Sequence, residues 1–183
     1  SGGRGMLQLT GKVAVVAGAG SVGPGWSNGR ATAVLLARRG ARVCALDRDE
    51  SSLDETRALI EAAGGRCLAR RCDMTAAAEV EAAVQACRDA FGRIDILVNN
   101  VGGSAPGDPV QMSEAVWDAQ MEHNLKTAFL GCKYVLPVMV AQGGGAIVNL
   151  SSVAALRMGT ERVHVAYSAS KAGSDLLARA YSR

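Results

Sequence analysis

Short apolar runs alternate along the chain with longer segments in which apolar residues recur every three or four positions. Most short runs are continuous, as in KVAVVAG and ARVCALD, which is typical of strands buried on both faces of a parallel sheet. The predicted strands are 12–18, 41–47, 66–73, 94–102 and 144–152. The longer segments have the period of amphipathic helices. The predicted helices are 28–40, 50–65, 76–92, 113–142 and 167–183, and Pro137 is a candidate for a kink in the fourth.

This alternation of strands and helices predicts an α/β fold, a Rossmann-like doubly wound parallel sheet with helices on both faces. One domain is expected at residues 9–183, after a tag or N-terminal extension at residues 1–8. In such sheets, ligands bind in a crevice beyond the carboxyl ends of the strands. Polar clusters follow the predicted strands at Gly18, Asp47, Asp73, Asn99-Asn100 and Ser151-Ser152.

Composition narrows the class of protein. The 183 residues are 49% hydrophobic, enough for one sizeable core. A net charge of +3, only 4% aromatic residues and no basic stripe argue against nucleic acid as a partner. No apolar run approaches the ~20 residues of a membrane span, so no membrane partner is expected. The five cysteines form no CxxC pair, which favours free thiols in a cytoplasmic protein, and no metal site is predicted.

The stretch AGAGSVGPGWSNG at 17–29 places five glycines between the first predicted strand and the first predicted helix. Glycines there would let phosphate oxygens approach the backbone and leave a helix N-terminus bare as an anion site. A dinucleotide fingerprint also needs an acidic residue about 20 positions further on. Asp47 lies 18 residues after Gly29. The alternative is an ordinary glycine-rich turn, and the loop alone does not decide between the two.

Tyr167 and Lys171 lie four residues apart at the start of a predicted helix, so their side chains share one face. A free tyrosine, with a pKa of ~10, is a poor acid or base at neutral pH. A lysine ammonium one turn away would stabilise the phenolate and bring proton transfer into the working range. Ser152, at the end of the preceding strand, could donate a hydrogen bond to a substrate oxygen. The alternative for each residue taken alone is that it has no catalytic role, because the pattern YxxxK occurs by chance in many helices.

Seven short motifs occur in a fixed order along the chain. They are VAGAGSVGPGWSNGRA (16–31), LD (46–47), CDMT (72–75), NNVG (99–102), HNLK (123–126), IVNLSS (147–152) and YSASK (167–171). Together they resemble the short-chain dehydrogenase/reductase family, specifically its single-domain, NAD(P)(H)-dependent branch. The resemblance runs from about Leu9 to Arg183, nearly the whole chain.

The resemblance implies hydride transfer between NAD(H) and a secondary alcohol or ketone. It implies that Tyr167 is the general acid/base, that Lys171 holds the nicotinamide ribose and stabilises the phenolate, and that Ser152 orients the substrate oxygen. Asn124 would serve a water-linked proton relay through a local kink in its helix. The cofactor-binding positions that it implies are Gly18, Ser27, Asn28, Gly29, Asp47, Arg48, Asp73, Met74, Asn99, Asn100, Gly102, Tyr167 and Lys171.

The same resemblance bears on the choice of cofactor. Asp47 would accept hydrogen bonds from the adenosine ribose, and a carboxylate there repels the 2′-phosphate of NADP(H). NAD(H) is therefore expected, with NADP(H) as the alternative because Arg48 follows directly. Asp73 would contact the adenine, and Asn99 with Gly102 would line the cofactor cleft.

The chain also departs from the family pattern. Gly18 and Gly29 are eleven residues apart, about five more than the pattern has. We interpret this as a phosphate loop carrying an insertion, with Gly29 opening the helix; alternatively, Gly23, Ser27 and Gly29 keep the spacing. The chain stops twelve residues after Lys171, where family members of roughly 250 residues continue, so the fold is expected to be C-terminally incomplete, with an open sheet edge exposing apolar surface.

Two expectations about partners follow. Helices 113–142 and 167–183 are apolar on more than one face, which predicts a homodimer or homotetramer, as in the family. The alternative to an enzyme acting on a small alcohol or ketone is a catalytically inactive dinucleotide-binding or oligomerisation module.

Overall fold

Five short segments form the sheet of this protein, and all but the third along the chain are mainly apolar. The structure, a computed structural model, describes residues 8–157 and 163–182. The strands are β1 (Val13–Ala17), β2 (Arg42–Asp47), β3 (Arg66–Arg71), β4 (Ile96–Asn99) and β5 (Ala146–Asn149). They are parallel and lie in the order β3-β2-β1-β4-β5. This order confirms the predicted Rossmann-like sheet, in which the direction of winding reverses between β1 and β4.

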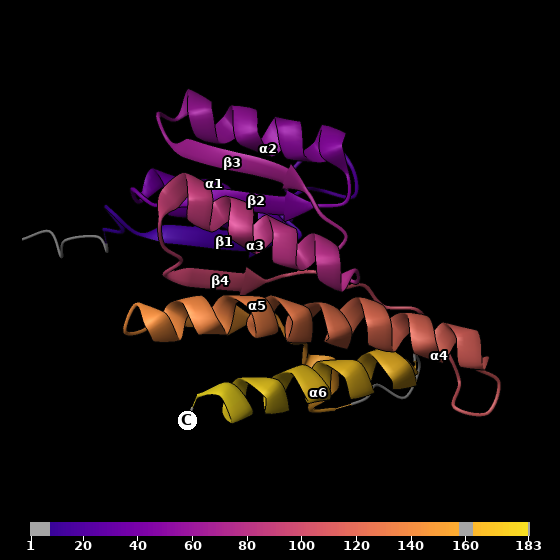
Figure 1. Cartoon of the computed structure of the whole chain (residues 1–183). Helices are drawn as coiled ribbons and strands as arrows, with labels where there is room; N and C mark the ends of the chain where they lie inside the picture. Colours follow the sequence, from indigo (N-terminus) through magenta and orange to yellow (C-terminus); the bar gives the residue numbers. More distant parts are fainter. Residues whose placement is uncertain (1–7, 158–162, 183) are drawn as a thin grey trace, which may run out of the picture.

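Helices cover both faces of the sheet (Figure 1). On one face lie α1 (Asn28–Arg38) and α2 (Glu50–Ala62), and on the other α3 (Ala77–Phe91), α5 (Thr127–Ala141) and α6 (Val165–Tyr181). Helix α4 (Glu114–Met121) continues into α5 through a π-helical segment, η1 (Glu122–Lys126), and a 3-10 turn, η2 (Val153–Ala155), follows β5. Figure 1 shows α4 and α5 as one long rod with α6 beside it.

Alternate residues of β1 point into two separate apolar cores. Val13, Val15 and Ala17 pack with α3 and α5, whereas Val16 packs with α1 and α2. Burying one such valine contributes about 1.5–3 kcal/mol. The continuous apolar sequence of β1 predicted a strand covered on both faces. Its side chains are the ones that pack both helix layers against the sheet.

The predicted helical stretch over 113–142 is confirmed as α4, η1 and α5 in direct succession, but its irregularity is not at Pro137. Pro137 lies inside α5, and the helix continues through it to Ala141. The irregularity is at η1, where the helix widens to a π turn that buries Asn124. Such turns often occur at functional sites, and this one has the position of the kink expected at Asn124.

Several element boundaries differ from those predicted. Strand β4 ends at Asn99 rather than 102, and β5 at Asn149 rather than 152, because the polar residues that follow leave the sheet. Helix α6 begins at Val165, two residues earlier than expected. Apart from Gln8, the predicted N-terminal extension at 1–8 lies outside the described residues, as does Arg183.

Strand β5 is one edge of the sheet, and Val148 on it is 50% exposed. Within residues 8–157 and 163–182, no helix has the length and apolar character needed to cross a bilayer.

A buried carboxylate ties the amino ends of β1 and β4 together. Asp95 Oδ2 accepts the Val13 N–H at 2.9 Å, and the two Asp95 oxygens lie 2.6–2.8 Å from Arg93. Lys12 Nζ is 3.5 Å away. Burial by itself would raise the pKa of Asp95, but the Arg93 guanidinium, the Val13 N–H and Lys12 together lower it below its ordinary value.

We expect Asp95→Ala to lower the free energy of unfolding at pH 7 by about 1–3 kcal/mol, because the Val13 N–H and Arg93 lose their acceptor. A lowered pKa stabilises the fold above the unfolded value of ~3.9, and this contribution is lost as the pH falls through the folded pKa. Urea unfolding at pH 7 and pH 3 should therefore show a smaller difference between variant and wild type at pH 3. An equal difference at both values would contradict the argument. Exposed Asp89→Ala is the control, with a change within about 0.5 kcal/mol.

Candidate functional site

A cleft of about 850 Å³ opens at the carboxyl ends of the strands, as the sequence predicted. Most of the predicted site residues line it. They are Gly18, Ser27, Asn28, Asp47, Arg48, Asp73, Met74, Asn100, Gly102, Tyr167 and Lys171. Gly29, Asn99, Asn124 and Ser152 do not line it.

The glycine-rich loop leads from β1 to the N-terminus of α1. Gly18 has φ 74°, a conformation that favours glycine, and Ser27 caps α1 by accepting the Arg30 N–H at 3.0 Å. Gly29 packs against Gly18: an added Cβ would collide with the Gly18 carbonyl oxygen and lie 2.5 Å from Asn100 Nδ2. Gly29 therefore lies in the first turn of the helix, and it permits close packing of loop on helix rather than facing the cleft.

Two carboxylates lie at the ends of β2 and β3. Asp47 accepts the Gly20 N–H on Oδ2 at 2.9 Å and the Asp49 N–H on Oδ1 at 3.1 Å. Asp73 Oδ1 accepts the N–H and the hydroxyl of Thr75 at 2.9 and 2.8 Å. These two bonds, the Thr75 N–H first, lower the pKa of Asp73. Both carboxyl groups are thus held in fixed orientations at the cleft wall.

The two asparagines that follow one another at the end of β4 have different surroundings. Asn100 lines the cleft, and its Nδ2 donates to the Gly18 carbonyl at 2.9 Å. Asn99 is buried, and its Nδ2 donates to Asn149 Oδ1 at 2.8 Å. A side chain at Gly131 of α5 would collide with Asn99. Contrary to the prediction, Asn99 does not line the cleft, because successive strand residues point to opposite faces.

Gly102, Asn124 and Lys171 meet at the cleft. A Cβ on Gly102 would lie 2.8 Å from Asn124 Oδ1 and 2.9 Å from Lys171 Nζ. Asn124 is 1% exposed; its Oδ1 accepts the Gly103 N–H at 2.9 Å and its Nδ2 donates to the Gly103 carbonyl at 3.0 Å. Lys171 Nζ donates to the Leu150 carbonyl at 2.8 Å, and burial lowers the pKa of this ammonium. Asn124 thus holds the cleft backbone instead of facing the cleft.

Tyr167 and Lys171 both line the cleft from the first turns of α6, with Lys171 Nζ 5.9 Å from the tyrosine ring centre. Of the two serines after β5, Ser151 lines the cleft. Ser152 Oγ instead accepts the Ala154 N–H at 3.2 Å and caps η2. The structure therefore brings the predicted tyrosine and lysine together, and it gives Ser152 a capping contact that the sequence did not indicate.

His123 lines the cleft, and sequence reasoning did not single it out. Burial lowers the pKa of His123 below 6.5, with the charges of Arg48 and Lys171 acting in the same direction and Asp73 opposing them. This shift favours the neutral form of the imidazole in the cleft wall. The sequence signal that could have identified His123 is its position in the HNLK motif, directly before Asn124.

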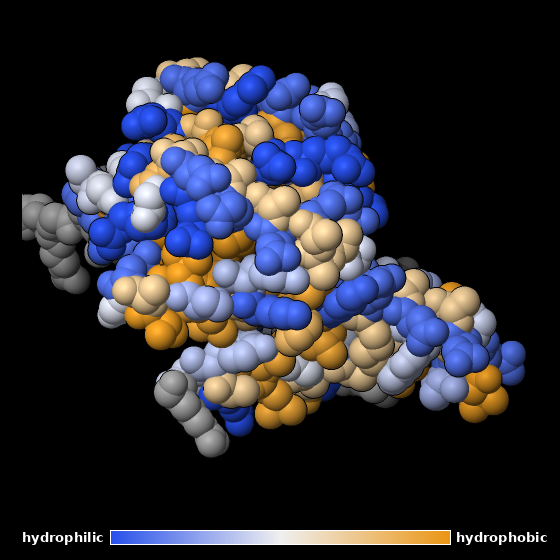
Figure 2. Space-filling view, viewed as in Figure 1, coloured by the Kyte–Doolittle hydropathy of each residue, from blue (hydrophilic) through white to orange (hydrophobic). Residues whose placement is uncertain are grey.

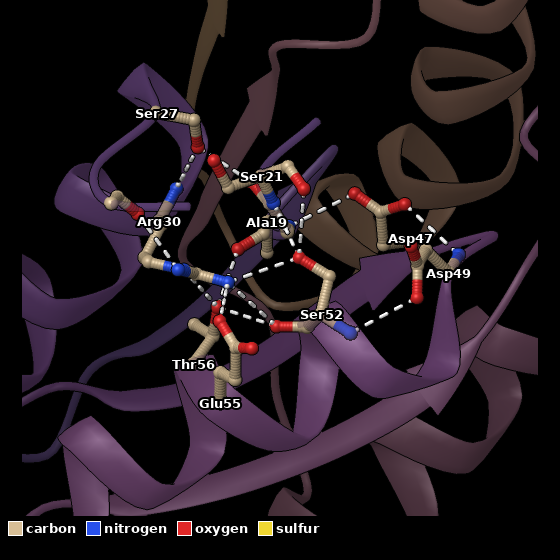
Figure 3. Close-up of polar contacts among 11 residues, drawn as sticks. Ala19, Ser21, Ser27, Arg30, Asp47, Asp49, Ser52, Glu55 and Thr56 are labelled. Carbon is tan, nitrogen blue, oxygen red and sulfur yellow. Dashed lines mark hydrogen bonds and ion pairs between the residues drawn. The ribbon is translucent and has the colours of Figure 1, made fainter. Parts of the chain in front are cut away.

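Sequence reasoning also missed a group of polar residues behind the glycine-rich loop (Figure 3). Arg30 of α1 and Ser52 and Thr56 of α2 are buried and bonded to one another. A serine and a threonine four residues apart on a helix are common, so the sequence carried no clear signal for this cluster.

Comparison with known proteins assigns the class. The family model for short chain dehydrogenases matches residues 12–183. D-threitol dehydrogenase of Mycolicibacterium smegmatis is 40% identical over 167 residues, 91% of this chain and 62% of that protein. A crystal structure described as a short-chain dehydrogenase/reductase of Burkholderia xenovorans is 52% identical with a TM-score of 0.89, covering 95% of this chain and 70% of that one. 7α-hydroxysteroid dehydrogenase, solved with NADH and 7-oxo glycochenodeoxycholic acid, is 32% identical with a TM-score of 0.85, covering 93% and 64%.

The fold, with its cleft at the carboxyl ends of the strands, is that of an α/β protein of the Rossmann type. The chain belongs to the short-chain dehydrogenase/reductase family. Solved structures similar to this chain include complexes with NADH and with NADP, the two cofactors of the family. The chain spans 62% of the length of D-threitol dehydrogenase, the curated relative described above.

Proposed function

We propose that this protein is an NAD(H)-linked oxidoreductase that interconverts a secondary alcohol and its ketone. The arrangement of the cleft carries the proposal. Asp47 and Asp73 line it beside β2 and β3, whereas Tyr167 and Lys171 line it from α6, which packs beside β5 at the other side of the sheet. One extended cleft thus joins an acidic wall to a tyrosine–lysine pair.

The residues present fit a dinucleotide. A volume of about 850 Å³ lies within the ~300–1,000 Å³ of small-molecule sites. A side chain at Gly102, which lines the cleft, would collide with Asn124 and Lys171, so the backbone there stays bare. Ser27 and Asn28 line the cleft at the N-terminus of α1, whose partial positive charge suits a diphosphate.

The tyrosine and lysine supply the proton chemistry in this proposal. Bound NAD⁺ would accept the hydride from the carbinol carbon of the alcohol. Tyr167 Oη, as phenolate, takes the hydroxyl proton in oxidation and, as phenol, returns it in reduction. The Lys171 ammonium, anchored on the Leu150 carbonyl, stabilises the phenolate and would hold the nicotinamide ribose.

Ser152 and Asn124 are proposed to support this step. For Ser152 to orient the substrate oxygen, its hydroxyl donates to that oxygen while still accepting the Ala154 N–H. Asn124 fixes Gly103 through two hydrogen bonds and so keeps the backbone beside Lys171 in place for a proton relay.

The test of the reaction is hydride transfer by the purified protein. Incubation with NAD⁺ and a panel of secondary alcohols should produce NADH, detected by its absorbance. The relatives described above carry dehydrogenase and reductase names, which favours an enzyme over an inactive module. Cofactor binding without turnover on any alcohol or ketone would contradict the proposed reaction and favour the inactive module.

The cofactor preference is proposed to depend on Asp47. Its negative charge at the end of β2 would repel a 2′-phosphate, and ~1.4 kcal/mol of repulsion already gives a tenfold preference. We therefore expect the wild-type Kd for NADH to be at least about tenfold below that for NADPH, and Asp47→Asn to bring the two within about threefold. Asparagine keeps one oxygen for the loop N–H while removing the charge.

Isothermal titration of both nucleotides measures this preference. Asp54→Asn is the matched control, because it removes the same charge from α2 at an exposed carboxylate that pairs with Arg57. A wild-type preference for NADPH, or an unchanged preference in Asp47→Asn, would contradict the assignment of Asp47.

We also propose that the protein assembles as a homodimer or homotetramer. Met121, Leu125, Phe129, Leu176 and Leu177 line an apolar groove between η1, α5 and α6. Figure 2 shows apolar surface over α5 and α6, and Leu176 is 64% exposed. Covering such a groove with a second copy would bury this surface. Sedimentation equilibrium should give at least twice the mass of one chain; a monomer would contradict the proposal.

A cytoplasmic location is the last part of this proposal. All five cysteines are free thiols, and four of them are buried. Free thiols are typical of a reducing compartment. Fractionation of the source cells should recover the protein in the cytosolic fraction.

A further inference from the structure

Arg30 is a buried cation in the first turn of α1, with 4% of its surface exposed. Its guanidinium donates to Thr56 Oγ1 at 3.1 Å, to the Gly25 carbonyl at 2.7 Å and to Ser52 Oγ at 3.0 Å (Figure 3). It also lies 2.8 Å from the carboxylate of Glu55. A buried charge is costly unless its donors are engaged. Here the planar fork of the arginine joins the glycine-rich loop to helix α2.

Ser52 and Thr56 bond the same loop nearer to its start. Thr56 Oγ1 donates to the Ala19 carbonyl at 2.9 Å, and Ser52 Oγ accepts the Ser21 N–H at 2.6 Å. We call these three residues, Arg30, Ser52 and Thr56, the Arg30 cluster. The loop backbone is thus bonded at both ends to one buried polar cluster.

Gly20 lies between these bonded points, and its N–H reaches Asp47 Oδ2 at 2.9 Å. The fit is tight, because a Cβ on Gly20 would lie 2.8 Å from Ser52 Oγ and 2.9 Å from Asp47 Oδ2. The second carboxylate oxygen accepts the N–H of Asp49, the N-cap of α2. The Asp47 carboxylate is therefore oriented by one bond to the loop and one to α2, and movement of the loop would release one side of it.

The composition of the loop explains why it needs such support. The five glycines of residues 17–29 lose much conformational freedom when they are ordered, and Gly25 has φ 99°. A compact turn is held by its own backbone. This longer loop is held by side chains that α1 and α2 supply.

We propose that Arg30 is a positioning residue for the Asp47 carboxylate, and thereby a determinant of the choice between NAD(H) and NADP(H). The inference rests on the proposed role of Asp47 at the adenosine ribose. Arg30 itself does not line the cleft, so its effect passes through the loop and the Gly20 N–H.

The test is the pair of Kd values for NADH and NADPH in wild type, Arg30→Met, Arg30→Lys and Glu55→Gln, measured by isothermal titration. Methionine nearly matches the length of arginine but has no donors, so Arg30→Met should raise the Kd for NADH about tenfold or more. The Kd for NADPH should rise less, because a displaced carboxylate also repels the 2′-phosphate less. The preference for NADH should therefore fall at least about threefold.

Two comparison variants separate positioning from general stability. Arg30→Lys keeps the charge and some donors and should recover part of the preference. Glu55→Gln removes the negative charge that pairs with Arg30 at the surface but none of the bonds of Arg30 to the loop, so the preference should stay within about twofold of wild type.

Trp26 gives an independent readout, because it lies in the loop and is 61% exposed. In a Trp117→Phe background, Trp26 is the sole tryptophan. Its fluorescence anisotropy should fall in Arg30→Met and stay unchanged in Glu55→Gln.

An unchanged ratio of the two Kd values in Arg30→Met, with a lower unfolding midpoint, would overturn the inference and leave Arg30 a stabilising residue only. If wild type prefers NADPH or binds neither nucleotide, the proposed role of Asp47 fails, and the inference fails with it. If Arg30→Met does not fold, Ser52→Ala removes the oxygen that accepts from both the Ser21 N–H and Arg30, while the bonds of Arg30 to the Gly25 carbonyl and Thr56 Oγ1 remain. It should shift the preference in the same direction. An unchanged preference in Ser52→Ala would then overturn the inference.

Discussion

Replacing Tyr167 with phenylalanine is expected to lower kcat by about a thousandfold while changing the Kd for NADH by less than about threefold. A positioned acid/base contributes typically ~10²–10⁴-fold to the rate. Phenylalanine keeps the ring on the first turns of α6 and removes only the hydroxyl. Lys171 stays bonded to the Leu150 carbonyl, so the cofactor end of the cleft keeps its cation. The loss should therefore appear in turnover and not in cofactor binding.

Steady-state kinetics measure the turnover, and titration with NADH measures cofactor binding. Tyr134→Phe is the matched control, because Tyr134 belongs to α5 and packs against the apolar core between the sheet and α3. It should leave kcat within about twofold. Retained turnover in Tyr167→Phe would show that another group supplies the proton, and the proposed reaction would need a different acid/base.

Gly29→Ala is expected to destabilise the fold by about 1–3 kcal/mol or more and to weaken NADH binding at least about tenfold. In an ordinary helix, alanine is more favourable than glycine by roughly 0.5–1 kcal/mol. Here the sign reverses, because the new Cβ would collide with the Gly18 carbonyl oxygen and approach Asn100 Nδ2 to 2.5 Å. The loop or the first turn of α1 must move, and both line the cleft.

Gly23→Ala is the control for this experiment, because it lies in the same loop and an added Cβ there meets nothing within 4 Å. Its unfolding free energy should change by no more than about 0.5 kcal/mol. Urea unfolding and isothermal titration with NADH measure both variants. Equal behaviour of the two variants would mean that close packing at Gly29 does not hold the cleft open.

Some residues of the candidate site could be predicted from the sequence, and others could not. Tyr167 and Lys171 were found because four residues make one helical turn, so proximity follows from local geometry. Asn99 and Asn100 were both assigned to the cleft, but only Asn100 lines it. Arg30 was not found, because its partners on α2 come together only when α1 and α2 pack on the same face of the sheet.

The sequence by itself determined the class of fold and the end of the sheet where the site lies. Continuous apolar runs alternating with helical periods leave a doubly covered parallel sheet as the arrangement that buries them, and polar residues then gather at the strand ends. The tertiary structure alone decided which side chains at those ends face the cleft and which support it from behind. The direction in which a side chain points depends on where its strand leaves the sheet. The partners of a buried polar group come from elements that are distant in sequence.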